Sequence, residues 1–188
     1  AQFIGDNDLK IATKEAGQLK KYIQAHPEIT DVLITGGDPL VMKTKNLRAH
    51  IEPLLELEQI RTIRIGSKAL TFWPQRVVSD DDAQDLLDLF REVQASGKHL
   101  ALMAHYNHWQ ELETDIAREA VRRVRATGAV IRAQGPLLAH INDNADDWAR
   151  LWQTQVELGI IPYYMFVERD TGARRYFEVP LAKAWEIY

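Results

Sequence analysis

The chain has 188 residues, of which 46% are hydrophobic and 27% charged, so its composition is that of an ordinary globular protein with a substantial core. The formal net charge is −4 and neither sign forms long blocks, which argues against a nucleic-acid or membrane surface. There is no apolar stretch near the roughly 20 residues of a membrane span, no recognisable signal peptide and no cysteine, so disulfides and thiolate ligands are excluded and a cytoplasmic location is expected.

Five apolar runs predict buried strands. In chain order they cover residues 31–35, 62–65, 99–104, 130–134 and 160–167. Most of these runs lack the alternation of polar and apolar residues that marks a half-exposed strand. They therefore indicate strands covered on both faces, as in a parallel sheet.

Helical patterns lie between the predicted strands. Capping residues open them, and glycine or proline follows their ends. Trp148 and Trp152, four residues apart on the last of these patterns, are predicted to be core residues. The predicted helices run from Thr13 towards Pro27, from Ser79 to Gly97, from Thr114 to Gly128 and from Asn144 to Gly159.

The strands recur at intervals of roughly 30 to 38 residues with a helix between them, which is the rhythm of βα units. A full eight-unit barrel takes about 250 residues. The predicted fold is therefore α/β, with a parallel sheet and outer helices, arranged as a partial, open (β/α) barrel or an open twisted sheet. No linker or repeat is visible, so residues 1–188 are expected to form one domain.

Ligands of such folds bind beyond the carboxyl ends of the strands, and these ends carry polar groups here. The first strand ends at Gly36, Gly37 and Asp38. The glycines permit a tight turn, and they also let a ligand approach the backbone, while Asp38 can accept bonds from an ammonium or hydroxyl group. Polar residues also stand at the ends of the later strands. Ser67 and Lys68 follow the second strand, and Gln134 ends the fourth. The third strand is followed by His105, Tyr106, Asn107 and His108, and the last strand runs through Tyr163, Tyr164, Phe166 and Glu168.

Two features of this rim have simpler interpretations. His105 and His108 have the spacing of metal ligands, but H-x-x-H in a loop is a weak signal, and hydrogen bonding explains His105 equally well. Asn142, Asp143 and Asn144 read as a turn with a helix cap, and Asp143 is also a candidate for meeting a substrate amine.

Five sequence motifs together resemble those of a known family. "DVLITGGDPL", "IRTIRIGSKA…PQRV", "HYNH", "GPLLAHINDN" and "IIPYYMF", in this order and spacing, are similar to the lysine 2,3-aminomutase family of radical S-adenosylmethionine enzymes. The resemblance runs from about Asp31 to Tyr188. It implies a radical S-adenosylmethionine-type partial barrel and an isomerase acting on a small amino-acid or lysyl-type substrate.

The resemblance also implies cofactors. A C-x-x-x-C-x-x-C motif holds a [4Fe–4S] cluster, which cleaves S-adenosylmethionine to a 5′-deoxyadenosyl radical. In the aminomutases proper, pyridoxal phosphate carries the migrating amino group, and its use by this protein stays open. By the same resemblance, Asp143 would face the distal amine of a lysine-like substrate. The implied S-adenosylmethionine-binding residues are Gly36, Gly37, Asp38, His105, Asn107 and Gln134, with residues 162–165 near the adenine.

The sequence departs from the family pattern at both ends. The cysteine motif is absent, the sequence begins at Ala1 without methionine, and it stops at Tyr188 within a helical pattern. We therefore expect a segment of a longer protein that cannot build the cluster by itself and is inactive alone. Lys183 matches no pyridoxal phosphate motif and is not assigned.

Two other functions stay open. One is a metal-dependent hydrolase with His105, His108 and Asp143 as ligands. The other is a cofactor-free binding or scaffold domain. The residues do not indicate the oligomeric state, and no nucleic-acid or membrane partner is expected.

Overall fold

The computed structural model describes residues 16–167 and 173–188. Thr13 and Glu168, which the sequence assigns to a helix cap and to the last strand, lie outside the described residues. None of the helices in the described residues is both long and apolar enough to cross a membrane.

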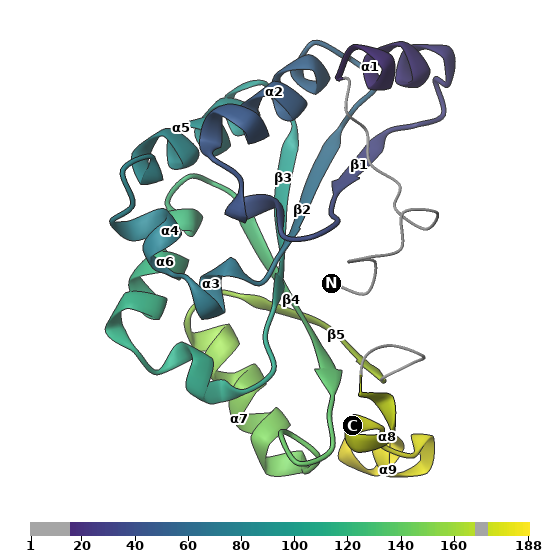
Figure 1. Ribbon diagram of the computed structural model, residues 1–188, viewed down its shortest axis with the longest axis vertical. Helices are drawn as coiled ribbons and strands as arrows, with labels where there is room; N and C mark the ends of the chain where they lie inside the picture. The colour runs from purple at the N-terminus through teal and green to yellow at the C-terminus, as the bar shows by residue number, and fades with distance from the viewer. Residues whose placement is uncertain (1–15, 168–172) are drawn as a thin grey trace.

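A five-stranded parallel sheet organises the fold, and its strands lie in the order β1-β2-β3-β4-β5 (Figure 1). Consecutive parallel neighbours with crossovers of one hand place their connecting helices on the same side of the sheet. Strands β1 and β5 are the two edges and do not pair with each other, so the predicted open, partial barrel is confirmed. The strands are β1 (Asp31–Ile34), β2 (Thr62–Ser67), β3 (His99–His105), β4 (Val130–Leu137) and β5 (Ile161–Val167).

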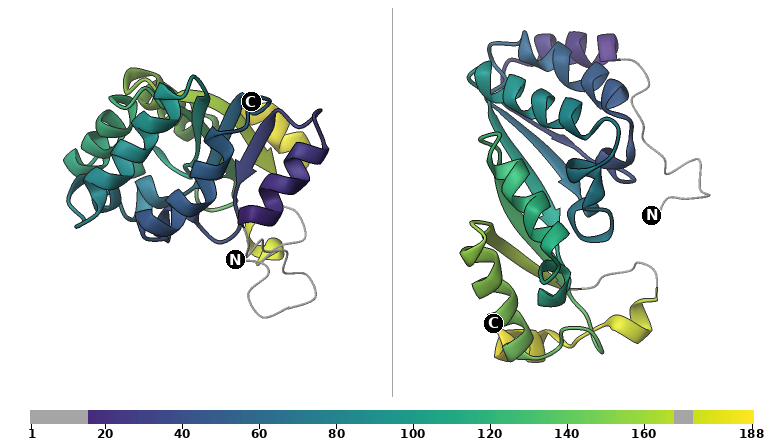
Figure 2. Two further views of the ribbon diagram at one scale, coloured as in Figure 1. Left: turned by 90° about the horizontal axis from the view of Figure 1, so that it is seen from above. Right: turned by 90° about the vertical axis from the view of Figure 1, so that its left-hand side faces the viewer.

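The helices that connect consecutive strands pack on the outer face of the sheet (Figures 1 and 2). Two short segments, α8 and α9, follow β5, and α9 packs against α7. The helices are α1 (Ala16–Ala25), α2 (Thr44–Leu55), α3 (Ala69–Phe72), α4 (Gln75–Val78), α5 (Ala83–Ala95), α6 (Asp115–Arg125), α7 (Ala145–Glu157), α8 (Arg174–Phe177) and α9 (Leu181–Ile187), with 3₁₀ turns η2 (Pro39–Val41) and η3 (Trp109–Leu112).

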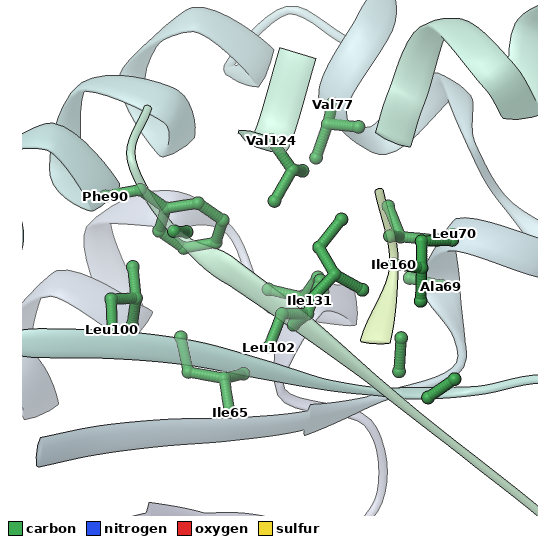
Figure 3. Packing of buried hydrophobic residues seen from close by; sticks show 14 of the residues in the cluster. Ile65, Ala69, Leu70, Val77, Phe90, Leu100, Leu102, Val124, Ile131 and Ile160 are labelled. Atoms are coloured by element: carbon green, nitrogen blue, oxygen red, sulfur yellow. The ribbon is translucent and has the colours of Figure 1, made fainter. Parts of the chain in front are cut away.

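The core fills the space between the sheet and these helices. Ile65, Leu102 and Ile131 project from neighbouring strands towards Phe90 and Val124 of the helical layer (Figure 3). Side chains of a strand alternate between its two faces. The residues that alternate with this core therefore lie on the opposite side of the sheet, which we call the inner face. Arg64, His105, Arg132, Gln134 and Tyr164 belong to it.

Most element ends agree with the sequence, but two predictions were wrong. Ser79 closes α4 instead of opening the next helix, and α5 begins at Ala83. The carboxylate of Asp82, at the N-cap position of α5, accepts hydrogen bonds from the Arg76 guanidinium and the Thr44 amide, so it joins three segments instead of capping its own helix. Strand β4 also continues past Gln134 to Leu137, because β5 still pairs with it there.

Candidate functional site

The turn after β1 depends on its two glycines. Gly36 and Gly37 have φ angles of +96° and +57°, in the left-handed region that other residues rarely adopt. A Cβ atom added to either would meet no atom within 4 Å. The backbone conformation thus requires glycine, and the space beside the turn is open to a ligand.

Asp38 joins the exit of β1 to the end of β2. Its Oδ1 accepts hydrogen bonds from the Leu40 amide at 3.0 Å and the Ser67 hydroxyl at 2.8 Å, and Oδ2 accepts from the Lys68 amide at 2.7 Å. Since a carboxylate has about four acceptor positions, three are already used. Asp38 therefore shapes the rim, and one acceptor position is left for a ligand.

Lys68 and Glu111 extend this connection to the loop after β3. The Lys68 ammonium lies 2.9 Å from Glu111 Oε1, and Glu111 Oε2 accepts hydrogen bonds from the amides of Asn107 at 2.6 Å and His108 at 3.2 Å. The ends of β1, β2 and β3 are thereby linked by one chain of hydrogen bonds. Lys68 was predicted to lie at the rim without a role, and Glu111 was not predicted from the sequence. The H-x-x-E spacing of a capping box was the available signal.

His105 ends β3 on the inner face. Its Nε2 lies 2.7 Å from Asn107 Oδ1 and donates to it, because an amide oxygen only accepts. Burial lowers the pKa of His105, and the charge of Lys68 lowers it further, against the opposing effects of the Asn107 hydrogen bond and the Glu111 charge. A neutral imidazole in this tautomer presents Nδ1 as an acceptor.

Gln134 and Tyr164 continue the row from His105 across the sheet. His105 pairs in register with Gln134, and Gln134 with Tyr164. The Tyr164 hydroxyl donates to Gln134 Oε1 at 2.6 Å, and the Phe166 ring lies edge-on to the His105 ring with centroids 6.1 Å apart. The structure thus brings three polar side chains and an aromatic ring together at the carboxyl ends of β3, β4 and β5.

A register shift in β5 falls within the predicted adenine-binding stretch, residues 162–165. Ala133 pairs with Pro162 and Gln134 with Tyr164, so Tyr163 is an extra residue in the ladder. Such bulges redirect side chains and are common beside active sites. Tyr163 and Tyr164 are both about half exposed, with relative exposures of 49% and 47%.

Three neighbouring residues in the loop after β4 have different roles. Asn142 is 1% exposed, donates to the carbonyls of Asn107 and Pro136, and accepts from the Leu138 amide. Asn144 caps α7 by accepting from the Asp147 amide at 2.9 Å, as predicted. The Asp143 carboxylate forms no hydrogen bond or ion pair within the described residues and is partly exposed. The hydrogen bond from Asn142 to Asn107 could not be foreseen because the two residues are 35 positions apart in the sequence.

His108 is engaged in local structure. Its Nδ1 accepts from the Gln110 amide at 3.3 Å, and its Nε2 lies 3.3 Å from Asp147 Oδ1. Among the described residues there is no group of three histidine or acidic side chains that could hold a metal ion. The grouping of His105, His108 and Asp143 proposed for a hydrolase therefore does not occur in this part of the chain.

The predicted residues lie outside two hollows of the described part of the chain. Two hollows of about 640 and 590 Å³ occur elsewhere, one lined by α6 and the end of α7 and the other by residues around the starts of α2 and α5. Neither includes Gly36, Asp38, His105, Gln134 or Asp143. The chemistry-bearing residues of the rim are thus not in these hollows.

This chain is similar in sequence to known proteins over nearly its whole length. No protein-family model matches the chain. A protein of Aquifex aeolicus, provisionally named L-lysine 2,3-aminomutase, is 37% identical over 185 residues, covering 98% of this chain and 48% of the relative. The L-lysine 2,3-aminomutase of Acetoanaerobium sticklandii is 28% identical over 186 residues, covering 99% of this chain and 42% of the enzyme. The chain thus spans about half the length of the relatives it matches.

The fold is also similar to a solved structure. Streptococcus suis SuiB, in a crystal structure with S-adenosylmethionine bound, superposes with a TM-score of 0.67 at 12% identity, covering 96% of this chain and 40% of that one. The similarity confirms the partial-barrel fold. By sequence, the resemblance is confirmed as well: nearly the whole length of this chain is similar to proteins named lysine 2,3-aminomutase.

Proposed function

We propose that this chain is the S-adenosylmethionine-binding core of a radical S-adenosylmethionine enzyme of the lysine 2,3-aminomutase type. The whole protein would act on an amino acid or a lysyl-type group. The observation that carries the proposal is the row of His105, Gln134 and Tyr164 at the carboxyl ends of three adjacent strands. It lies where parallel α/β folds bind ligands, in a chain homologous to aminomutases.

The rim residues fit S-adenosylmethionine chemically. His105 Nδ1 and the remaining acceptor position of Asp38 suit its ammonium and hydroxyl groups, and the Lys68 ammonium suits its carboxylate. The Phe166 ring and the Tyr164 ring offer apolar surface for its adenine. Bound to a reduced iron–sulfur cluster, S-adenosylmethionine supplies radical chemistry.

The residues of this chain do not fit the cluster itself. There is no cysteine among its 188 residues, and thiolates are the ligands such clusters need. The chain therefore supplies no thiolate ligand to an iron–sulfur cluster. Lys183 is exposed on α9 and is not assigned to pyridoxal phosphate.

The contribution of this chain is placement. The Asp38–Lys68–Glu111 bonds fix the ends of β1, β2 and β3 relative to one another, so that donors and acceptors are held before a ligand arrives. Binding to a preformed rim avoids the entropic cost of ordering these side chains. Holding a substrate against a reactive cofactor is the protein's part in such enzymes.

Asp143 is the proposed contact for a substrate amine. Its neighbours Asn142 and Asn144 are used in bracing and capping, whereas its own carboxylate has no partner in the described residues. Asp143→Asn should weaken binding of 1,5-diaminopentane by about tenfold, since a charged contact is lost, and should leave S-adenosylmethionine affinity unchanged. Equal losses for both ligands would assign Asp143 a structural role.

The central test is binding of S-adenosylmethionine to the purified chain, measured by isothermal titration calorimetry. We expect saturable binding that His105→Ala weakens by about tenfold or more. His26→Ala is the matched control, since His26 lies between α1 and the start of β1, at the opposite end of that strand from the rim. Absence of binding, or equal affinity in the His105 variant, would refute the proposal and favour the scaffold interpretation.

A further inference from the structure

Arg132 lies on the inner face of β4, two residues before Gln134. Its neighbours in the chain, Ile131 and Ala133, are buried against the outer helices, so its own side chain points to the opposite face. Arg132 pairs in register with Met103 on one side and Ile161 on the other. Two residues along a strand span about 7 Å, so the guanidinium is within one ligand length of the rim.

Arg132 differs from the other arginines that are not exposed in the described residues. Arg48, Arg64 and Arg76 each donate to a carboxylate, and Arg123 donates to two backbone carbonyls. Arg132 is half-buried and forms no hydrogen bond or ion pair within residues 16–167 and 173–188. Its recorded contact is with the Tyr163 ring, 5.5 Å from the ring centroid.

This arrangement leaves the hydrogen-bonding capacity of the guanidinium unused. Arginine carries five N–H donors in a planar fork that matches a carboxylate or a phosphate, and contact with an aromatic ring satisfies none of them with an oxygen acceptor. Tyr163 is the extra residue of the β5 bulge, so the bulge helps to place the ring beside the cation. Partial burial strengthens the attraction of the guanidinium for an anion relative to full exposure.

We propose that Arg132, positioned by Tyr163, is the oxyanion subsite of the inner face and binds a carboxylate or phosphate group of the ligand held at the rim. This inference rests on the proposed function, because it takes the inner face as the side on which substrate lies. It defines the substrate class further: a molecule with an amine for Asp143 carries an oxyanion that reaches Arg132.

The test uses the ¹⁵N-labelled 188-residue chain and follows arginine Nε–Hε signals in ¹H–¹⁵N NMR spectra. The probes are L-lysine, which carries a carboxylate, inorganic phosphate, and 1,5-diaminopentane, which has neither group. We expect L-lysine or phosphate to shift the Arg132 signal, which is assigned by its loss in Arg132→Lys. Arg132→Met should weaken the binding of that probe by about tenfold or more and leave the binding of 1,5-diaminopentane unchanged.

Arg64→Met is the matched control. Arg64 is an inner-face arginine on a strand, but it is already paired with Asp31, at 2.7 Å, so its loss should not change binding. A response to L-lysine alone assigns a carboxylate subsite, and a response to phosphate alone assigns a phosphate subsite. If neither probe shifts the Arg132 signal, or if Arg132→Met binds as the wild type does, the inference is overturned.

The two proposals fail separately. A chain that does not bind S-adenosylmethionine but binds an oxyanion through Arg132 would refute the proposed function and leave the subsite standing. A chain that binds S-adenosylmethionine in a His105-dependent way, with no oxyanion response at Arg132, would do the reverse.

Discussion

His105 is subject to opposing influences at the rim. Burial and the positive charge of Lys68 lower its pKa, while the Asn107 hydrogen bond and the negative charge of Glu111 raise it, with burial the largest effect. The folded pKa therefore lies below the ordinary value of about 6.5. On acidification the unfolded chain takes up this proton first. The contribution of His105 to stability is thus complete above about pH 6.5 and is lost as the pH falls from there towards the folded pKa.

Two substitutions separate the charges that act on His105. Lys68→Met removes a positive charge and should raise the pKa of His105, and Glu111→Gln removes a negative charge and should lower it further. The measurement is a pH titration of the His105 ring proton signals by NMR. A His105 pKa that does not respond to Lys68→Met would contradict this electrostatic account.

Single residues at the rim were partly predictable from sequence. Gly36, Asp38, His105 and Gln134 were identified because they follow apolar runs, and parallel strands bring such positions to one edge. What Asp38 does could not be foreseen, because its partners Ser67 and Lys68 lie about 30 residues away. Hydrogen bonds between distant segments leave no local pattern, and the same reason explains why the bond from Asn142 to Asn107 was not predicted.

Strand β4 depends on a close approach that only glycine allows. A Cβ atom on Gly135 would lie 2.2 Å from the backbone oxygen of Tyr106, which follows β3. Gly135→Ala should therefore destabilise the fold by about 3 kcal/mol, since backbone atoms must move apart. Urea denaturation followed by circular dichroism measures this. Gly66→Ala in β2, where the nearest atom is a Thr35 side-chain oxygen at 3.4 Å, should cost less than about 1 kcal/mol. Similar losses for the two variants would argue against a backbone clash.

Arg76 connects α4 to the starts of α2 and α5. Its side chain is 1% exposed and donates to Asp82 Oδ1 at 2.7 Å and to the carbonyls of Leu40 and Met42. Arg76→Met leaves these acceptors without a donor and should destabilise the fold by about 3 kcal/mol. Arg91→Met removes an exposed ion pair with Asp88 and should cost less than about 1 kcal/mol by the same urea assay. A cost as small for Arg76 would mean that solvent replaces its hydrogen bonds.

At the level of elements, the periodicity of apolar residues predicted which helices and strands exist better than it predicted where they begin and end. All five strands were identified, because unbroken apolar runs are characteristic of buried parallel strands. Helix α2 was missed, because Pro53 lies inside it and no side chain caps it at Lys43. Its buried Leu47, Ile51 and Leu54 nevertheless follow helical spacing, which was the signal available. The extension of β4 to Leu137 was missed because Pro136 looks like a strand breaker. It is tolerated there because the β3 ladder has already ended at Gln134.

In the part of the chain that the structure describes, the molecule is an open sheet whose outer face is covered by helices and whose inner face carries exposed side chains. Local sequence patterns cannot specify which strands are neighbours, so a partial barrel and a twisted open sheet were equally compatible with the βα rhythm. The family resemblance favoured the partial barrel, and the sequential strand order confirms it. That order brings every strand end to one rim in chain order. The inner face keeps large apolar side chains exposed at both edges: Leu33 in β1, and Ile161, Tyr164 and Phe166 in β5.

Hydrogen–deuterium exchange can test this geometry across the whole molecule. If S-adenosylmethionine binds at the rim, protection should increase together in segments that are distant in sequence but adjacent in space, because the ligand stabilises the state it binds. The protected segments should be residues 35–38, 66–69, 105–108, 134–137 and 163–166 at the carboxyl ends of the strands.

Segments at the amino ends of the same strands are the internal control. Residues 59–62, 97–100 and 128–131 lead into β2, β3 and β4 at the ends of these strands opposite to the rim, so their exchange should change least. A ligand that merely stabilises the fold as a whole would slow exchange equally at the amino and carboxyl ends of the strands. The ligand would bind elsewhere than on the rim formed by His105, Gln134 and Tyr164 if protection were equal at both ends of the strands. The same would follow if protection were confined to the hollow lined by α6 and the end of α7.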